Sequence, residues 1–298
     1  MRNNKQAIVG AVFIVAGILG ALPLILQETT ENFFTFFTKP PSYNVITKNI
    51  PITGTAAFVY EINTQKELYA DNANTALPLA SITKVMAAVV AAEELAPNTS
   101  ITITAEDLAL PEVQGLVLNE EWQLKDLLNF GLITSSNDAF NAIGRKVFEE
   151  TGVTLPALMN KKAKMLGLTN TTFYNETGLD LPNGKNGGYS TCREVSLLLS
   201  YAYTAPNNVL AITGQPNLTV RSLSGIEHKV NNTDVLASKI SWLKAGKTGL
   251  TRIAGGNLAV IAEPRADKPV AVCVLGSTET ARFVDVEALI TTLIEETS

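Results

Sequence analysis

The sequence predicts an α+β fold in which strands from both ends of the chain form one mostly antiparallel sheet and the middle forms a helical lobe. Two β-rich runs at 56–62 and 67–70 flank a short turn, which indicates a hairpin. Between residues 81 and 202 the pattern is helical and is broken by turns rich in Gly and Asn. After about residue 217 the sequence returns to β-rich runs, and a closing helix is expected over 280–295.

The individual elements follow from local composition. The run 81–95 is dense in Ala, contains no Gly or Pro and ends before Pro97, which favours a buried helix. Further helices are expected at 124–132, 138–151, 155–166 and 191–202. Later strands are expected at 218–223, 256–262 and 270–275, with a turn at Glu263-Pro264 between the last two.

The N-terminal segment has a different character. Residues 7–26 contain no charged residue and follow Arg2 and Lys5, and about 20 apolar residues are enough to cross a bilayer core. We expect residues 1–26 to be a single-pass anchor in the cell membrane, with the rest of the chain on the extracytoplasmic side. A cleavable signal peptide has the same polarity and is the alternative. Residues 27–52 are expected to be a tether, which leaves 53–298 as the folded domain.

Composition excludes several classes of function. The chain has 298 residues, 46% of them hydrophobic, and a net charge of −5, so it is an ordinary globular protein and nucleic acid is not an expected partner. It has one histidine, His228, and two cysteines, Cys192 and Cys273, which are too few ligands for a zinc site. His228 is interpreted as a strand residue. The cysteines are expected to be small buried side chains, with pairing outside the cytoplasm left open.

The first motif with chemical potential is Ser81-Ile82-Thr83-Lys84, at the start of the alanine-rich helix. Residues three apart share a helix face, so the Ser81 hydroxyl and the Lys84 amine are expected within hydrogen-bonding reach. An apolar surround disfavours a charged lysine and favours the neutral amine that can act as a base. The alternative is a serine that caps the helix beside a solvated lysine.

The second motif is Ser135-Ser136-Asn137, in the turn between two expected helices. Its hydroxyls and amide could relay a proton to a leaving group and hydrogen-bond a substrate amide. Helix capping is the competing interpretation, and the two roles are compatible.

The third motif is Lys247-Thr248-Gly249. Lys and Thr offer a cation and a hydroxyl to a carboxylate, and Gly249 allows a ligand to approach a strand backbone. A phosphate-binding loop is a weaker interpretation, since that pattern needs a glycine where the chain has Ser241, and β texture follows instead of a helix. A plain exposed lysine in a β-turn remains an alternative for this motif alone.

Together, in this order, the three motifs match the signature of class A β-lactamases and penicillin-binding proteins. From about residue 56 to 293 the chain resembles the D-alanyl-D-alanine carboxypeptidases, the low-molecular-mass penicillin-binding proteins. The stretches that carry the resemblance are LPLASITKVMAAVVA, TSSNDAFNAIG, TTFYNETGLD, KAGKTGLT followed by IAGGNLAV, and ARFVDVEAL. The resemblance implies a β-lactamase/transpeptidase-like fold with the site between the sheet and the helices.

The resemblance also implies roles for individual residues. Ser81 would be acylated, Lys84 would activate it, and Ser135 with Asn137 would line the opposite wall. The backbone N–H groups of Ser81 and Leu250, the residue after Gly249, would form an oxyanion hole. Lys247 and Thr248 would hold the substrate carboxylate with Arg282, for which a surface pair with Asp285 is the alternative.

The implied substrate is the peptidoglycan stem pentapeptide, whose terminal D-alanine is released through an acyl-enzyme, with β-lactam antibiotics as inhibitors. No metal, nucleotide or other cofactor is required. The alternatives are an endopeptidase that cuts D-Ala cross-links, a β-lactamase, and a non-catalytic sensor of cell-wall peptides or β-lactams. The glycine-rich stretch 183–189 departs from the His or Asn followed by Ser and Ala of many relatives. A loop of different shape here would alter the groove, so the resemblance does not define which substrate the chain prefers.

Overall fold

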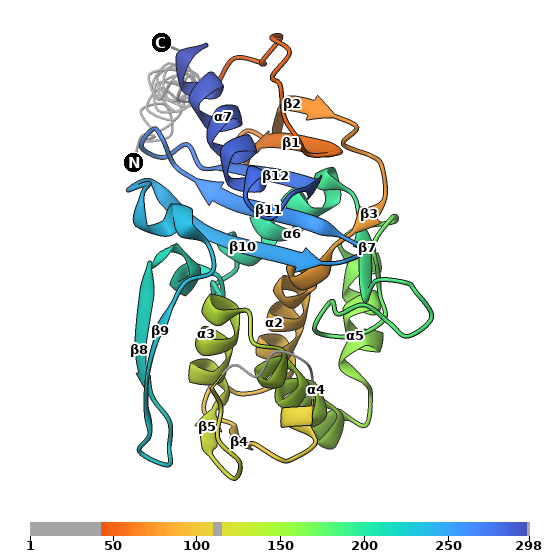
Figure 1. The fold of residues 1–298 in the computed structure, drawn as a ribbon, viewed down its shortest axis with the longest axis vertical. Coiled ribbons are helices and arrows are strands. Elements are labelled where there is room, and N and C mark those ends of the chain that lie inside the picture. Colours follow the sequence, from red (N-terminus) through yellow and green to blue (C-terminus); the bar gives the residue numbers. More distant parts are fainter. Residues whose placement is uncertain (1–42, 110–114, 297–298) are drawn as a thin grey trace, which may run out of the picture. The chain divides into compact units, whose positions relative to one another are not determined.

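The structure is a computed structural model that describes residues 43–109 and 115–296 of the chain. Its central feature is a five-stranded antiparallel sheet in the order β10-β11-β12-β1-β2 (Figure 1). The strands are β1 (Ala56–Glu61), β2 (Lys66–Asp71), β10 (Leu243–Thr251), β11 (Gly255–Ala262) and β12 (Val270–Ser277). Because β1 pairs directly with β12, the expected meeting of the two ends of the chain in one sheet is confirmed.

The middle of the chain is helical, as the sequence predicts. The helices are α2 (Thr83–Glu94), α3 (Leu124–Thr134), α4 (Asn137–Thr151), α5 (Leu155–Met165) and α6 (Cys192–Thr204), and α7 (Ala281–Glu295) follows the last strand (Figure 1). Every residue of α2 from Thr83 to Ala91 is buried, because its small and apolar side chains suit contact on all sides. A 3-10 turn, η1 (Ala80–Ile82), precedes α2 and lies against β10.

The two faces of the sheet bury different side chains. On β12, Ala271 and Cys273 face the helical lobe, whereas Val270, Val272 and Val274 face α7. Alternate residues of a strand point to opposite faces, so each central strand contributes to two apolar cores. The Sγ atom of Cys273 lies 3.2 Å from that of Cys192 at the start of α6. Both cysteines are fully buried, which confirms that they are small core side chains.

The strand expected at 218–223 does form, but it lies outside the main sheet. β8 (Asn217–Arg221) pairs only with β9 (Glu227–Asn231) in a two-stranded ribbon. His228 of β9 is a strand residue, as predicted, and its Nε2 lies 2.7 Å from Glu120 Oε1. The His228 ring also packs against Trp122 and Phe130. These contacts attach the ribbon to the helical lobe.

Short elements complete the described part of the chain. The remaining strands and 3-10 turns are β3 (Leu77–Pro78), β4 (Ser100–Thr102), β5 (Glu121–Gln123), β6 (Thr172–Phe173), β7 (Gly188–Ser190), η2 (Asp107–Ala109), η3 (Ala211–Gly214) and η4 (Val235–Ser238). β3, β7 and β6 form a small sheet that connects the segment before Ser81 to the glycine-rich stretch 183–189.

Tyr43, the first described residue, already packs on the folded unit, ahead of the boundary expected at residue 53. Tyr43, Ile46 and Ile50 are buried in the core under α7, and the N–H of Ile46 donates to Leu68 O at 2.7 Å. Residues 43–52 therefore pack on the domain instead of continuing the tether. Their apolar residues follow no regular period, so the sequence pattern gives no sign of this contact.

The expected anchor at residues 7–26 lies outside the described residues. None of the helices within the described residues has the length and apolar character that a bilayer span requires.

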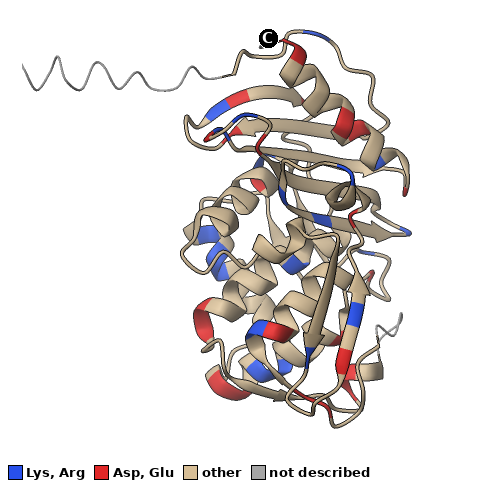
Figure 2. Cartoon of the chain, turned by 90° about the vertical axis from the view of Figure 1, so that its left-hand side faces the viewer, with Lys and Arg blue, Asp and Glu red and all other residues tan. Residues whose placement is uncertain are grey.

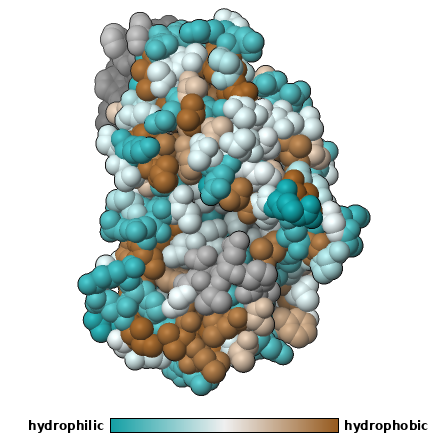
Figure 3. Space-filling view, viewed as in Figure 1, coloured by the Kyte–Doolittle hydropathy of each residue, from teal (hydrophilic) through white to brown (hydrophobic). Residues whose placement is uncertain are grey.

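On the described surface, charge is mixed. Figure 2 shows basic and acidic residues interspersed along the helices and strands of the face in view. The exposed apolar residues include Val117 and Leu118, which are 46% and 49% exposed and lead into β5. Figure 3 shows apolar surface gathered in the region of β4, β5 and α4.

One close backbone contact shapes the start of α2. Ala80 has a φ of +50°, a left-handed conformation that side-chain-bearing residues seldom adopt. Gly178, whose own φ is +80°, packs directly on it: a Cβ atom on Gly178 would lie 1.9 Å from Ala80 O and 2.9 Å from Thr83 Oγ1. Only glycine fits at position 178 without displacing the backbone next to Ser81.

Replacement of Gly178 by alanine should therefore destabilise the chain. Left-handed strain costs roughly 1–2 kcal/mol and overpacking about 1–3 kcal/mol, so we expect the free energy of unfolding to fall by roughly 2–5 kcal/mol in urea denaturation. Gly184→Ala is the matched control, because Gly184 also has a φ of +80° but a Cβ there would meet nothing within 4 Å. Its expected loss is about 1–2 kcal/mol. Equal losses in the two variants would contradict the contact between Gly178 and Ala80.

Candidate active site

Ser81 and Lys84 lie on adjacent turns at the start of the central helix. Ser81 belongs to η1 and Lys84 to the first turn of α2, and Lys84 Nζ lies 2.8 Å from Ser81 Oγ. Lys84 is fully buried, whereas Ser81 is partly exposed. The predicted proximity of amine and hydroxyl is confirmed. The alternative of a capping serine with a solvated lysine is wrong, since no side chain caps α2.

Two further oxygen atoms surround the Lys84 amine. Asn137 Oδ1 lies 2.8 Å and Thr177 O 2.7 Å from Nζ. Carboxamide and carbonyl oxygens only accept hydrogen bonds, so in the neutral amine the two N–H protons serve these oxygens. In that neutral form the nitrogen lone pair is left for Ser81 Oγ, and Lys84 can then accept the proton of that hydroxyl.

The second motif divides its tasks among its three residues. Ser136 caps α4, and its side chain accepts from Ala139 N at 3.1 Å, so the predicted capping is confirmed. Ser135 ends α3 in a left-handed conformation with a φ of +62°, and Asn137 is the first residue of α4. This sharp turn lets the side chains on either side of Ser136 contact the two motif lysines.

The third motif lies on an edge strand of the sheet. Lys247 Nζ is 2.8 Å from Ser135 Oγ and 2.9 Å from Thr248 O, and the Lys247 side chain is 1% exposed. β10 continues to Thr251 and is followed by β11, so no helix follows the motif and the phosphate-loop interpretation is wrong. The exposed-turn interpretation is also wrong, because Lys247 is buried within a strand.

Burial and neighbouring charge act together on Lys247. Burial lowers the pKa of Lys247 well below its usual range, and the positive charges of Lys84 and Arg282 lower it further. The negative charge of Asp234 opposes these effects. Burial in turn raises the pKa of Asp234 to about 6, against the N–H of Leu236 and the nearby cations, which lower it. Asn137, which contacts Lys84, and Ser135, which contacts Lys247, are two residues apart, so both lysines approach the same turn between α3 and α4.

The residues after Lys247 continue this polar region. Thr248 Oγ1 lies 2.7 Å from Thr233 Oγ1, and Arg282 Nη1 donates to Gly249 O at 2.7 Å. Arg282 is 6% exposed, so the alternative of a surface pair with Asp285 is wrong. Asp285 instead accepts from the backbone N–H groups of residues 53 and 54 and from the hydroxyl of residue 277. Two cations and a hydroxyl therefore gather where an anionic group could bind.

Sequence comparison places the chain among known proteins. A family model described as D-alanyl-D-alanine carboxypeptidase matches residues 44–279. The chain belongs to this family. A D-alanyl-D-alanine endopeptidase of Escherichia coli is 29% identical over 240 residues, which span 75% of this chain and 71% of that protein. A D-alanyl-D-alanine carboxypeptidase of Mycobacterium tuberculosis is 32% identical over 198 residues, 66% of each chain.

Solved structures agree with the family assignment. Penicillin-binding protein D2 of Listeria monocytogenes, in its ampicillin-bound form, matches with a TM-score of 0.72 and 31% identity over 83% of this chain and 100% of that one. A mutant of the Streptomyces K15 DD-transpeptidase has the same fold, with a TM-score of 0.73, 24% identity and coverage of 83% and 100%. The penicillin-binding, transpeptidase-like fold implied by the resemblance is confirmed.

Sequence reasoning missed several groups at the family's site. Thr177 contributes a backbone carbonyl, which leaves no trace in a sequence pattern. Asp234 is 1% exposed, and its Oδ2 atom has no hydrogen-bond partner among the described residues. A Cβ on Gly246 would lie 2.5 Å from this oxygen, so the carboxylate sits directly against β10. In the sequence, Asp234 is marked only by being a single acidic residue directly before the apolar run 235–237.

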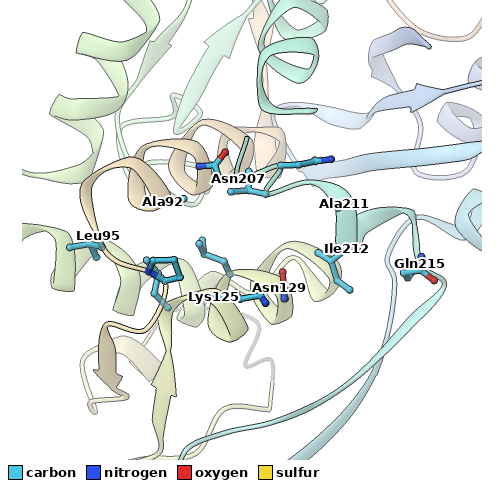
Figure 4. A pocket seen from close by; sticks show the side chains of 13 residues that line it. Ala92, Leu95, Lys125, Asn129, Asn207, Ala211, Ile212 and Gln215 are labelled. Carbon is cyan, nitrogen blue, oxygen red and sulfur yellow. The ribbon is translucent and has the colours of Figure 1, made fainter. Parts of the chain in front are cut away.

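A pocket of about 730 Å³ lies apart from this site, between the far end of α2, α3 and the segment 207–215 (Figure 4). Ala92, Asn129 and Ile212 are among its lining residues, and none of the motif residues is. The active site is therefore assigned from the convergence of reactive groups, not from the size of a cavity.

The charge balance at Lys247 predicts a shift in pH dependence. Asp234→Asn removes the negative charge that raises the pKa of Lys247, so this pKa should fall further and the ammonium form should be lost at lower pH. Asparagine keeps an oxygen for the N–H of Leu236. We expect the alkaline limb of the rate of acylation by a fluorescent penicillin to move to lower pH, in stopped-flow measurements from pH 6 to 10. Asp126→Asn, which removes a carboxylate that does not act on Lys247, should leave the limb in place. A limb unchanged in Asp234→Asn contradicts the coupling.

Proposed function

We propose that the chain is a serine-type D-Ala-D-Ala carboxypeptidase that removes the terminal D-alanine from peptidoglycan stem pentapeptides through an acyl-enzyme on Ser81. The observation that carries the proposal is the 2.8 Å contact between Lys84 Nζ and Ser81 Oγ, beside the turn whose Ser135 contacts Lys247 and whose Asn137 contacts Lys84. A serine hydroxyl becomes a nucleophile when an adjacent base takes its proton. Membership of the D-alanyl-D-alanine carboxypeptidase family supports the reaction class.

Acylation begins with proton transfer. Lys84 takes the proton of Ser81 as Oγ attacks the carbonyl carbon of the penultimate D-alanine. Negative charge develops on the carbonyl oxygen, and the backbone N–H groups of Ser81 and Leu250 stabilise it. Loss of one such donor typically raises the barrier by about 2.7–4 kcal/mol.

The bond to the terminal D-alanine then breaks. Its nitrogen leaves as an amine after receiving, through Ser135 Oγ, the proton that Lys84 took from Ser81, so Lys84 returns to its neutral form; Lys247 Nζ holds Ser135 Oγ at 2.8 Å. The product is an ester of Ser81, and water attacks this ester to release the shortened peptide and restore the hydroxyl. Asn137 holds Lys84 in place and hydrogen-bonds the substrate amide.

The substrate carboxylate binds at the other end of the site. Lys247 and Thr248 supply a cation and a hydroxyl, and Gly249 leaves room for the peptide to approach the strand. Arg282 adds a second positive charge beside Gly249 O. A free carboxylate on the last residue is what distinguishes a carboxypeptidase substrate from an internal peptide bond. β-Lactam antibiotics carry a carboxylate in a similar place, and a relative of this chain is known in an ampicillin-bound form.

The location of the enzyme rests on the N-terminal residues. We infer that residues 7–26 anchor the chain in the cell membrane with the catalytic domain on the extracytoplasmic side, where peptidoglycan is. The uncharged run after Arg2 and Lys5 supports this arrangement. An alkaline carbonate wash of cell membranes tests it, because a spanning anchor keeps the protein in the pellet and a cleaved signal peptide does not.

The alternative functions use the same residues. An endopeptidase acting on D-Ala cross-links is favoured by the name of the Escherichia coli relative. A β-lactamase would turn penicillin over rapidly, and a non-catalytic sensor would bind it without peptidase activity. Release of free D-alanine from a pentapeptide, compared with cleavage of a cross-linked dimer, separates the carboxypeptidase from the endopeptidase.

The nucleophile is tested directly by Ser81→Ala. Covalent labelling of the full chain by a fluorescent penicillin should be stoichiometric in the wild type and absent in this variant, because no oxygen remains to be acylated. D-Alanine release should fall by at least about a thousandfold. Ser238→Ala, at an exposed serine of η4, is the matched control and should label fully. Labelling of Ser81→Ala at the wild-type level would remove Ser81 from its role.

A further inference from the structure

Asn186 lies in the glycine-rich stretch 183–189. Residues 183–185 are exposed, yet the Asn186 side chain is 0% exposed. A buried carboxamide needs partners for both its oxygen and its nitrogen. Asn186 finds both sets of partners behind the candidate active site.

The oxygen of Asn186 holds the backbone next to the nucleophile. Its Oδ1 accepts from the N–H of Ala80 at 3.2 Å and from that of Gly188 at 3.1 Å. Ala80 immediately precedes Ser81 and is left-handed, with a φ of +50°. Gly178 packs against the carbonyl of Ala80. Because that carbonyl and the N–H of Ser81 belong to one planar peptide unit, these contacts fix the direction of the Ser81 N–H.

The nitrogen of Asn186 reaches the end of β10. Its Nδ2 donates to Asp180 Oδ1 at 2.7 Å and to Gly178 O at 3.1 Å, and it lies 3.3 Å from Thr251 Oγ1. Asp180 continues the connection: its Oδ1 accepts from Thr251 Oγ1 at 2.9 Å, and its Oδ2 accepts from Ile253 N at 3.2 Å. Asn186 and Asp180 therefore hold the turn that directly follows Leu250.

We propose that Asn186 and Asp180 are positioning residues that set the spacing between the two halves of the oxyanion hole. One half is the N–H of Ser81, beside Ala80, and the other is the N–H of Leu250, beside Thr251. The proposal rests on the proposed function, in which these two N–H groups stabilise the attacked carbonyl. Neither side chain touches the substrate.

The expected effect is on the chemical step. Oxyanion donors work only at about 2.7–3.1 Å from the oxygen on which charge develops. A misplacement of about 1 Å in such a site lowers rates by on the order of 100-fold. The groups proposed to bind the substrate carboxylate, Lys247 and Arg282, make no hydrogen bond with Asn186 in the described structure. Loss of Asn186 should therefore slow acylation while leaving the affinity for the non-covalent complex nearly intact.

Stopped-flow acylation of the full chain by a fluorescent penicillin separates the two quantities. The concentration dependence of the rate gives the dissociation constant of the non-covalent complex and the rate constant of acylation. In Asn186→Ala we expect the acylation rate constant to fall by about ten- to hundredfold and the dissociation constant to stay within about threefold. An acylation rate constant within about twofold of the wild type overturns the proposal.

A pair exchange tests the contact itself. Asn186→Asp keeps the acceptor for Ala80 but places a carboxylate against Asp180, so acylation should slow strongly. Adding Asp180→Asn restores an amide–carboxylate contact and an acceptor for Ile253 N, so the double variant should recover acylation by at least about fivefold over Asn186→Asp. The comparison of the double variant with Asn186→Asp also tests the positioning role if Asn186→Ala does not fold. An absence of recovery in the double variant overturns the proposal.

A matched control separates positioning from stability. Asn160 in α5 makes the same kind of contacts, because its side chain bonds Pro156 O and both backbone groups of Phe173. Asn160→Ala should lower the urea midpoint without changing the acylation rate constant. Ser81→Ala serves as the independent check on the proposed function. If that variant is silent while Asn186→Ala acylates at the wild-type rate, only the positioning role is overturned. If it still labels, the proposed nucleophile fails.

Discussion

Two lysine side chains are buried within electrostatic reach of each other, and the structure around the site depends on keeping them there. Lys84 is 0% and Lys247 1% exposed. Removing an ammonium group from water is unfavourable unless other groups stabilise it, and a second cation nearby adds to the cost. Oxygen atoms from separate segments of the chain contact each nitrogen: those of Asn137 and Thr177 contact Lys84, and that of Ser135 contacts Lys247. Two helices, a loop and an edge strand have to meet at this point for the site to exist.

The position of the edge strand β10 also depends on stabilising the buried Lys247 amine. At its first half, the N–H of Gly246 donates to Thr213 Oγ1 at 3.0 Å, and the carboxylate of Asp234 lies against the Gly246 backbone. A side chain at position 246 would displace this carboxylate, which is the negative charge that partly supports Lys247. Glycine at position 246 therefore leaves room for the Asp234 carboxylate, and it also keeps the negative charge of that carboxylate close to Lys247. The second half of β10 carries Thr248 and ends at Thr251, whose hydroxyl donates to Asp180 Oδ1.

The sequence predicted the elements that depend on local pattern, and the site residues that lie in short motifs. The helix at Ser81 and the Ser81–Lys84 contact follow from spacing within one helix. The contacts of Lys84 with Thr177 and of Asp180 with Thr251 join segments 93 and 71 residues apart and involve a backbone carbonyl or an ordinary acid, so no pattern marks them. For the same reason the sequence placed residues 43–52 in a tether, although Tyr43 and its neighbours complete the core under α7.

Backbone strain explains how buried amines and accessible hydroxyls coexist. Ala80 and Ser135 are both left-handed without being glycine, with φ values of +50° and +62°. Such residues persist only where surrounding contacts hold them, and they occur preferentially at functional sites. Here one lies directly before Ser81 and the other is Ser135 itself, and both serines are partly exposed. Each of these hydroxyls also contacts a buried amine: Ser81 Oγ contacts Lys84 Nζ, and Ser135 Oγ contacts Lys247 Nζ. The strained backbone thus accompanies two hydroxyls that are open to solvent on one side and bonded to an interior lysine on the other.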